Sequence, residues 1–364
     1  MHKTAAWPMA LLYVGLIVYA SLYPFSVWRD PGLMPWAFLT APFPRYWTGF
    51  DVAINMVGYA PLGGLLALSA LRTGRGRHAV WMPTVAALAL SLVLEALQTY
   101  LPARVASKED WFLNGMGAWV GSVATLLLVR LGAIDRWSRV RARWFVEDAR
   151  GGIVLLATWP LALLFPAAVP FGLGQVLFRA EQALAELMLD TPFLAWLPVR
   201  EDTLQPLVPG LQMVCVFLGL LIPCLLGFCI IRTCWRRVVL VPMTMAVGVV
   251  VTGLSAALSW GPSHAWAWLD LPTQVGMAVA VAVAWGLVVV PWRASAALAL
   301  LSLGIYLSLL NQAPENPYFA QTLQNWEQGR FIRFHGLAQW LGWLWPYATL
   351  VYLLSQIWQR DAKT

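Results

Sequence analysis

Charged residues are scarce in this sequence, at 11% of its 364 residues, while hydrophobic residues make up 60%. Soluble globular domains carry about 25% charged residues, and the mean hydropathy of this chain is +0.67. The composition therefore excludes a soluble domain and predicts a polytopic membrane protein. We expect an all-α fold, a bundle of transmembrane helices.

Cysteine and histidine are also rare, with four residues of each. The cysteines lie in or beside one apolar run without the close pairing typical of metal sites or disulfide frameworks. They are Cys215, Cys224, Cys229 and Cys234. The sequence also has no nucleophile elbow and no phosphate-binding glycine loop. It therefore predicts no metal and no cofactor, and it leaves open whether the protein is an enzyme.

Long apolar runs of about 20 residues, the length that a membrane-spanning helix needs, recur along the chain. They lie at about residues 7–24, 52–71, 80–101, 111–130, 152–170, 207–231, 238–258, 273–290, 294–310 and 337–357. We therefore expect about ten spans.

The net charge of +7 has a topological explanation. If the N-terminus is cytoplasmic, most Lys and Arg residues fall on the cytoplasmic side and most Asp and Glu residues on the outer side, as the positive-inside rule predicts. We therefore expect both termini in the cytoplasm. The positive charge is therefore explained without a nucleic-acid partner. We expect the protein to contact membrane lipids.

A basic segment at residues 133–150 is the predicted boundary between two units. We expect a four-helix transmembrane unit before it (residues 1–132), a cytoplasmic linker along it, and a six-helix transmembrane unit after it (residues 151–364). Apolar residues at helical spacing in 175–190 predict an amphipathic helix on the outer membrane surface.

The predicted outer loop at residues 311–336 places arginines beside aromatic residues. Such a combination suits recognition of a phosphate, a carboxylate or a glycan. An ordered lid whose charges pair with one another explains it equally well. The candidate residues of this loop are Glu327, Arg330, Arg333 and His335.

Glu95 is the one acidic, basic or histidine residue in the interior of the predicted spans. An ionisable side chain at membrane depth is costly, which favours a functional site with a partner nearby. Polar residues recur at helical spacing at the outer ends of the second, third and fourth spans, so we expect them to converge. They are Asp51, Asn55, Ser91, Glu95, Gln98, Asp110 and Asn114.

The predicted partners of Glu95 are Arg104, in the outer turn between the third and fourth spans, and the amides Gln98, Asn55 and Asn114. Gly117 and Gly121 form a G-x-x-x-G pair, which predicts close packing of the fourth span against another helix. A purely structural Glu95 that ties three helices together is the alternative to a binding site.

The N-terminal third resembles the VanZ-like family over about residues 10–130. The resemblance rests on spaced residues in the family's order: Asp51, Asn55, Pro61, Gly63, Glu95, Gln98, Pro102, Arg104, Ser107, Asp110, Asn114, Gly117 and Gly121. It implies an integral membrane protein of the bacterial envelope, in the cytoplasmic (inner) membrane. The founding member of the family is associated with low-level resistance to a glycopeptide antibiotic. The matching polar positions that we take as the candidate site are Asp51, Asn55, Glu95, Gln98, Arg104, Asp110 and Asn114.

Three functions fit these observations. The first is binding or modulation of a lipid-linked or cell-wall carbohydrate at the outer leaflet, linked to glycopeptide resistance. A transporter or lipid flippase is the second, although the C-terminal half repeats no polar stripe of the kind that inverted-repeat carriers show. The third is an intramembrane enzyme that uses Glu95 or Asp110 as a general base.

Overall fold

The computed structural model of the chain describes residues 6–23, 25, 28–42, 49–102, 104–165, 167–189, 191–192, 207–232, 235–260, 262–313 and 332–361. Regular secondary structure in these residues is helical, apart from one isolated bridge between Phe145 and Ile231. The all-α prediction is therefore confirmed. The chain forms two compact units, Met1–Val140 and Arg141–Thr364.

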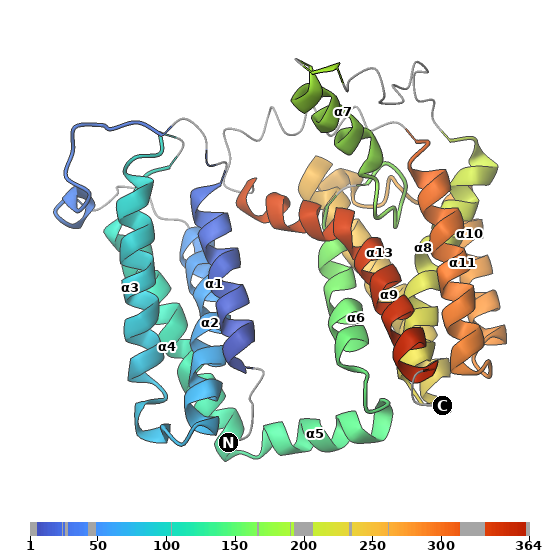
Figure 1. Cartoon of the computed structure of the whole chain (residues 1–364), viewed down its shortest axis with the longest axis horizontal. Helices are drawn as coiled ribbons and strands as arrows, with labels where there is room; N and C mark the ends of the chain where they lie inside the picture. Colours follow the sequence, from blue (N-terminus) through green and yellow to red (C-terminus); the bar gives the residue numbers. More distant parts are fainter. Residues whose placement is uncertain are drawn as a thin grey trace. The chain divides into compact units, whose positions relative to one another are not determined.

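Four long helices build the N-terminal unit (Figure 1). They are α1 (Ala6–Leu22), α2 (Gly49–Arg72), α3 (Trp81–Gln98) and α4 (Lys108–Arg130). Short 3-10 helices lie between α1 and α2 (η1, Ala37–Leu39) and between α2 and α3 (η2, Gly76–His78). Successive helices run in opposite directions, so the ends of α1 and α3 lie at the same end of the unit as the starts of α2 and α4.

Helices α2 and α4 pack backbone against backbone along a seam of glycines. A Cβ atom added at Gly117 would overlap the carbonyl group of Met56, and one added at Gly121 would overlap that of Ala60. Gly63 on α2 meets the carbonyl of Ala118 in the same way. The close packing predicted from the G-x-x-x-G pair is confirmed, and its partner is α2.

The predicted linker at residues 133–150 contains a helix, α5 (Ala133–Trp144), followed by a turn. After the turn, Val146 N donates to the carbonyl of Ile230 at 2.9 Å and Arg232 N donates to that of Trp144 at 3.1 Å. The end of the basic segment is thereby bound to the C-terminal unit.

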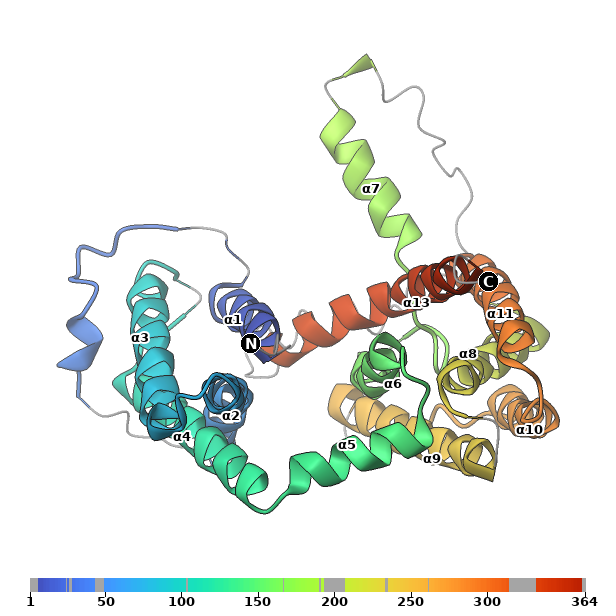
Figure 2. The ribbon, with the colours of Figure 1, turned by 60° about the horizontal axis from the view of Figure 1, so that its bottom comes forward.

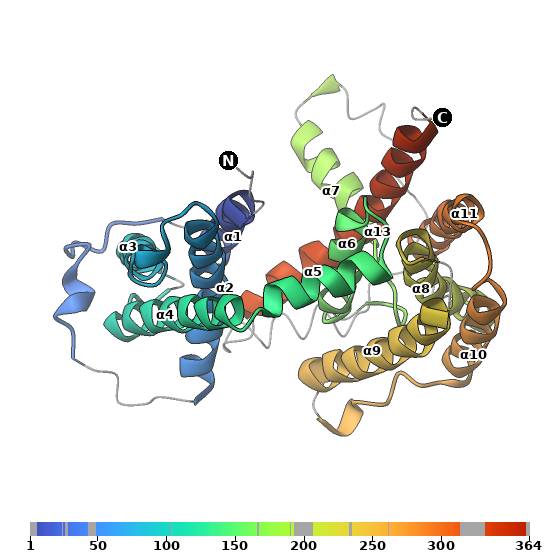
Figure 3. The same cartoon turned by 90° about the horizontal axis from the view of Figure 1, so that it is seen from below.

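The C-terminal unit is a bundle around α8 (Figures 2 and 3). Its helices are α6 (Arg150–Leu163), α7 (Leu177–Met188), α8 (Pro209–Ile230), α9 (Trp235–Trp260), α10 (Leu271–Gly286), α11 (Trp292–Leu310) and α13 (Ile332–Asp361), with the 3-10 helix η4 (Pro262–His264) before α10. Helix α8 packs against α6, α9, α10 and α11, and most of its length is buried. Helix α7 lies within the predicted amphipathic segment 175–190.

Six of the described helices are long and apolar enough to cross a membrane: α2, α3, α4, α8, α9 and α11. Helices α1, α6 and α10 are shorter apolar helices. The protein is therefore a multi-pass helical membrane protein, whereas the number of about ten spans and the cytoplasmic termini stay predictions.

Helix α6 is shorter than the apolar run that predicted it, because the chain leaves the helix after Leu163 and folds back into the bundle. In this buried turn Phe171 adopts a left-handed backbone conformation, with φ of 61°. The Tyr306 hydroxyl donates to the Phe171 carbonyl at 2.6 Å and accepts from Leu173 N. The Asn311 side chain accepts from Val176 N at 3.1 Å, at the start of α7. These contacts hold the turn in place.

Arg237, at the start of α9, is buried, with 2% of its surface exposed. Its guanidinium donates to the carbonyls of Phe228 (2.6 Å) and Ile231 (3.1 Å) at the end of α8. It also donates to the carbonyls of Val288 (3.1 Å) and Val290 (2.7 Å), just after α10. The last carbonyls of a helix have no partner within the helix, so this arginine satisfies the end of α8 and joins it to the segment that follows α10.

Asp270 is the N-cap of α10, and its replacement by alanine is expected to destabilise the C-terminal unit by about 0.5–2 kcal/mol. Its carboxylate accepts from Thr273 N at 3.0 Å and from Gln212 of α8 at 2.7 Å. Partial burial disfavours the charged form, but hydrogen bonds from Thr273 and Gln212 outweigh it, so the pKa of Asp270 is lowered.

A lowered pKa in the folded state means that the carboxylate stabilises the fold above its unfolded pKa of about 3.9 and loses this effect as pH falls through the folded pKa. Thermal unfolding of wild type and Asp270→Ala should therefore differ at pH 7 and converge in acid. A constant difference down to pH 2 would contradict this assignment.

Candidate functional site at the α3–α4 turn

The candidate site lies where α3 ends and α4 begins, next to the end of α1 and the start of α2 (Figure 1). Ser107 is the N-cap of α4, with its hydroxyl accepting from Asp110 N at 3.3 Å. The same hydroxyl donates to Oε2 of Glu109 at 2.7 Å. The first turn of α4 is therefore ordered by its own polar side chains.

Glu95 lies near the end of α3 with only 4% of its surface exposed. Its Oε2 accepts a hydrogen bond from the backbone N–H of Ser107 at 2.8 Å. The carboxylate thus binds the chain where it returns into α4, beside the positive end of the α4 dipole. This contact closes the α3–α4 turn.

Two further hydrogen bonds join the three helices. Asn55 of α2 donates to Oδ1 of Asp110 at 2.6 Å. Asn114 of α4 donates to the Ser91 hydroxyl of α3 at 2.9 Å. Tyr59, one turn after Asn55, also hydrogen-bonds to Ser91 and lies close enough to Glu95 for an electrostatic interaction. The polar stripes of α2, α3 and α4 therefore converge, as their spacing predicted.

Gln98 and Arg104 bind the end of α1. Gln98 Nε2 donates to the carbonyl of Ser21 at 3.0 Å. Arg104 donates to the carbonyls of Ala20 at 3.1 Å and Tyr23 at 2.7 Å. These two side chains satisfy C-terminal carbonyls of α1, and Arg104 adds a cation at the negative end of its dipole.

Two buried acceptor atoms at this turn have no hydrogen-bond partner among the described residues. They are Oε1 of Glu109 and Oδ1 of Asn114. Glu109 and Asn114 are 7% and 6% exposed. A buried polar atom without a partner costs about 1–3 kcal/mol, so both positions favour a ligand or water that donates hydrogen bonds. We call Ser91, Glu95, Ser107, Glu109 and Asn114 the turn cluster.

The chemistry of the turn cluster is that of a hydrogen-bond acceptor site. Within the described ranges, no group of three or more His, Cys, Asp or Glu side chains could hold a metal ion. The acceptors Glu109 Oε1 and Asn114 Oδ1 instead fit hydroxyl or amide donors.

The structure describes most of the predicted site residues. Asn55, Glu95, Asp110 and Asn114 form hydrogen bonds at the turn, and Gln98 and Arg104 form hydrogen bonds to carbonyls at the end of α1. The side chains of Asp51, Arg333 and His335, and all of Glu327 and Arg330, lie outside the described residues.

The sequence interpretation did not include Glu109 or Tyr59 in the site. Tyr59 could have been found, because it follows Asn55 at the i+4 spacing that marks the polar stripe. Glu109 carries no such signal, because an acidic residue in the first turn of a helix is ordinary capping.

Comparison with known proteins gives one match. The family model described as VanZ/LLP1 matches residues 7–129, which is the N-terminal third of the chain. No curated protein and no solved structure matches significantly. The match spans α1 to α4 with the turn cluster, and it stops before α5.

Proposed function

We propose that this membrane protein, VanZ-like in its N-terminal third, binds the hydroxyl-bearing head of a lipid-linked or cell-wall carbohydrate at the α3–α4 turn. The positive-inside distribution of charge supports placing this turn at the outer leaflet of a bacterial cytoplasmic membrane. A binding site at the outer leaflet would contact carbohydrates on lipid carriers from within the plane of the membrane.

The observation that carries the proposal is the pair of buried acceptors, Glu109 Oε1 and Asn114 Oδ1. Sugar hydroxyls are donors, and a hydrogen bond to a carboxylate is worth about 1.5–3 kcal/mol. Glu95 and Ser107 hold the first turn of α4 in place. The acceptors are therefore fixed before the ligand arrives, which lowers the entropic cost of binding.

A second feature is the aromatic segment at residues 28–42, which packs onto the same helix ends. Arg29 N donates to the carbonyl of Tyr100 at 3.1 Å, and Thr99 donates to that of Pro35 at 3.4 Å. Trp28 and Trp36 on this segment are exposed. Exposed tryptophans at a membrane interface suit an amphipathic ligand with a polar head and an apolar tail.

The resemblance to the VanZ-like family extends the proposal to glycopeptide resistance, through binding of a lipid-linked or cell-wall carbohydrate component. A membrane protein that holds such a component by its head would shield it or alter its supply. We therefore propose a non-catalytic role in glycopeptide resistance for the N-terminal unit.

Replacement of Asn114 by leucine is expected to weaken carbohydrate binding about tenfold, equivalent to about 1.4 kcal/mol. The change removes the acceptor Oδ1 while keeping the volume of the side chain. Glu109→Gln should weaken binding at least as much, because the atom that replaces an oxygen is a donor. The measurement is the affinity of the full chain in lipid nanodiscs for a polyprenyl-diphosphate-linked disaccharide.

The matched control is Ser122→Ala. Ser122 is buried on the same helix and donates to Gly63 O at 3.1 Å, but it lies outside the turn cluster. The Ser122→Ala variant should lose some stability and keep its affinity for the ligand. Cells that carry it should keep wild-type glycopeptide susceptibility, unlike cells with Asn114→Leu. Equal affinity for the sugar-free polyprenyl diphosphate, or no change in Asn114→Leu and Glu109→Gln, would refute the proposal.

A further inference from the structure

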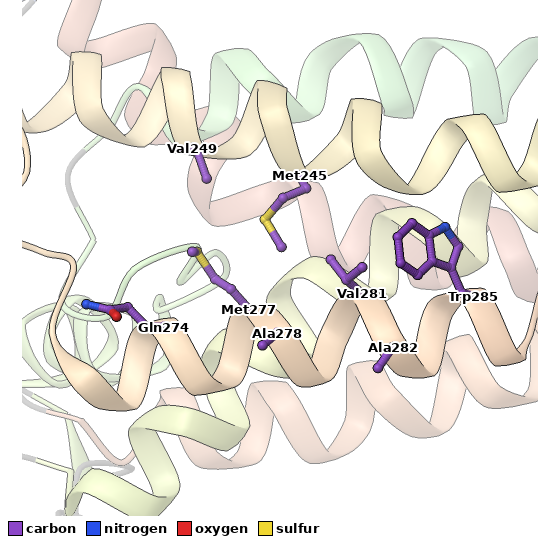
Figure 4. A pocket seen from close by; sticks show the side chains of 8 residues that line it. All are labelled: Met245, Val249, Gln274, Met277, Ala278, Val281, Ala282 and Trp285. Atoms are coloured by element: carbon purple, nitrogen blue, oxygen red, sulfur yellow. The ribbon is translucent and has the colours of Figure 1, made fainter.

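An open groove runs between α9 and α10 in the C-terminal unit, away from the VanZ-like match. Its volume is about 480 Å³. The lining residues are Met245, Val249, Gln274, Met277, Ala278, Val281, Ala282 and Trp285. Figure 4 shows the side chains of Met245, Met277 and Val281 in the space between the two helices. All of the lining except Gln274 is apolar, so the groove suits a hydrocarbon chain.

The groove has the length of a lipid tail within one leaflet. Its lining on α10 extends from Gln274 to Trp285, which is about 16 Å at 1.5 Å per residue. Half of the hydrocarbon core of a bilayer is about 15 Å. Helix α9 is among the helices able to cross a membrane, and α10 is a shorter apolar helix beside it. A tail could therefore lie in the groove along its whole length.

One end of the groove is continuous with exposed aromatic and apolar residues of α9. Trp285 donates from its indole nitrogen to the carbonyl of Val238, in the first turn of α9. Trp235, Val238 and Met245 share a helix face by their spacing, and Trp235 and Val238 are exposed. The apolar surface thus continues from the groove to the beginning of α9.

Arginines gather at this same end of α9. Arg236 lies over the ring of Trp144, at 5.4 Å, and donates to the carbonyl of Arg143. Trp144 also contacts Trp235, with ring centroids 5.8 Å apart. Arg232 donates to the carbonyl of Phe145 at 3.3 Å. We call Arg143, Arg232 and Arg236 the basic cluster.

The basic cluster has capacity for an anion. The buried Nε of Arg236 has no acceptor among the described residues, and Arg143 and Arg232 are exposed. Glu147 and Asp148, also exposed, lie in the turn that follows, so the region is not purely cationic. Arginine nevertheless binds phosphate by several parallel hydrogen bonds.

We propose that this surface is a binding site for an anionic glycerophospholipid, with its phosphate at the basic cluster and one acyl chain in the α9–α10 groove. The charge distribution that orients the chain puts this end of α9 on the cytoplasmic side, where anionic lipids attract basic segments. The site is separate from the turn cluster and does not depend on carbohydrate binding.

The test is native mass spectrometry of the full chain, released from nanodiscs that contain phosphatidylglycerol and phosphatidylcholine with matched acyl chains. Wild type should retain phosphatidylglycerol in preference. At about a factor of five for each basic residue near the membrane surface, Arg232→Gln with Arg236→Gln should reduce its retention about 30-fold. Arg75→Gln, an exposed arginine of the N-terminal unit, is the charge control and should change nothing.

The groove is tested without touching the charges. Ala278→Phe and Ala282→Phe add bulk at exposed positions of the lining, so the fold should be retained. They should reduce retention of long-chain phosphatidylglycerol, while Val279→Phe, exposed on the same helix but outside the lining, should not.

Four results would overturn the proposal. The first is equal retention of the two lipids by wild type, which would mean that the headgroup charge does not affect binding. The second is undiminished retention in both phenylalanine variants, which would place the lipid elsewhere. The third is a dimer that Ala282→Phe dissociates, which would make the groove an interface between two copies of the chain. Competition by glycerol 3-phosphate alone, with no effect of the phenylalanine variants, would reduce the site to a phosphate site and also contradict it.

Discussion

Replacing Gly121 with valine is expected to unfold the N-terminal unit. Any Cβ atom at this position would overlap the backbone carbonyl of Ala60, and backbone atoms cannot move aside as the end of a flexible side chain can. Helices α2 and α4 would have to separate, which breaks the neighbouring contacts at Gly117 and Gly63. Overpacking costs about 1–3 kcal/mol where side chains can adjust, so we expect a loss of more than 3 kcal/mol here.

The control for Gly121→Val is Gly58→Val. Gly58 lies on α2 of the same unit, and a Cβ atom there would meet nothing within 4 Å. Both variants replace glycine by valine within a helix and share the same small gain in helix propensity, well below 1 kcal/mol, so their difference isolates the packing. The measurement is the yield of monodisperse protein together with its thermal unfolding. A Gly121→Val protein as stable as Gly58→Val would contradict backbone packing at this seam.

Replacing Arg237 with lysine is expected to destabilise the C-terminal unit by about 2–6 kcal/mol, although the charge is retained. A guanidinium presents five donors in a planar fork, while an ammonium is a compact charge with three. Lysine cannot reach carbonyls at the ends of both α8 and α10 together. The carbonyls of Phe228 and Val290 would be left without their donor, at about 1–3 kcal/mol each.

Thermal unfolding of Arg237→Lys, compared with Arg150→Lys, checks this expectation. Arg150 is an exposed arginine at the start of α6 and should tolerate the change within about 0.5 kcal/mol. Equal midpoints for the two variants would mean that the buried arginine is dispensable. Since Arg237 lies beside the end of α10, its loss should also loosen the Trp285 end of the groove.

Much of the fold was accessible from sequence because apolar runs of membrane length leave few alternatives to helices. The G-x-x-x-G pair correctly predicted a close helix contact. Arg237 shows where this reasoning stops, because the positive-inside count treats every arginine near a span as a topology signal. In the structure Arg237 is instead buried, and its guanidinium connects the end of α8 to the segment that follows α10. Only the packing of α8 beside α10 creates that position.

The candidate site was predictable where side chains bind side chains. Asn55 and Asp110, or Ser91 and Asn114, stand out as polar residues at helical spacing, and the structure joins them. Gln98 and Arg104 were expected as partners of Glu95, and their hydrogen bonds to carbonyls of α1 were not part of that prediction. Every residue carries a backbone carbonyl, so a hydrogen bond to one cannot be predicted from residue types. The same holds for the Ser107 N–H that binds Glu95.

The capping of α1 by Gln98 and Arg104 sets an order on how the chain can assemble. Ser21 and Gln98 are 77 positions apart, and Ala20 and Arg104 are 84 apart. Synthesis proceeds at about 5–20 residues per second. The side chains of Gln98 and Arg104 that cap the end of α1 are therefore made roughly 4–17 s after the helix itself. During this interval its carbonyls depend on water at the membrane surface. Helix α1 therefore completes its packing in the N-terminal unit late, only after the turn before α4 has been synthesised.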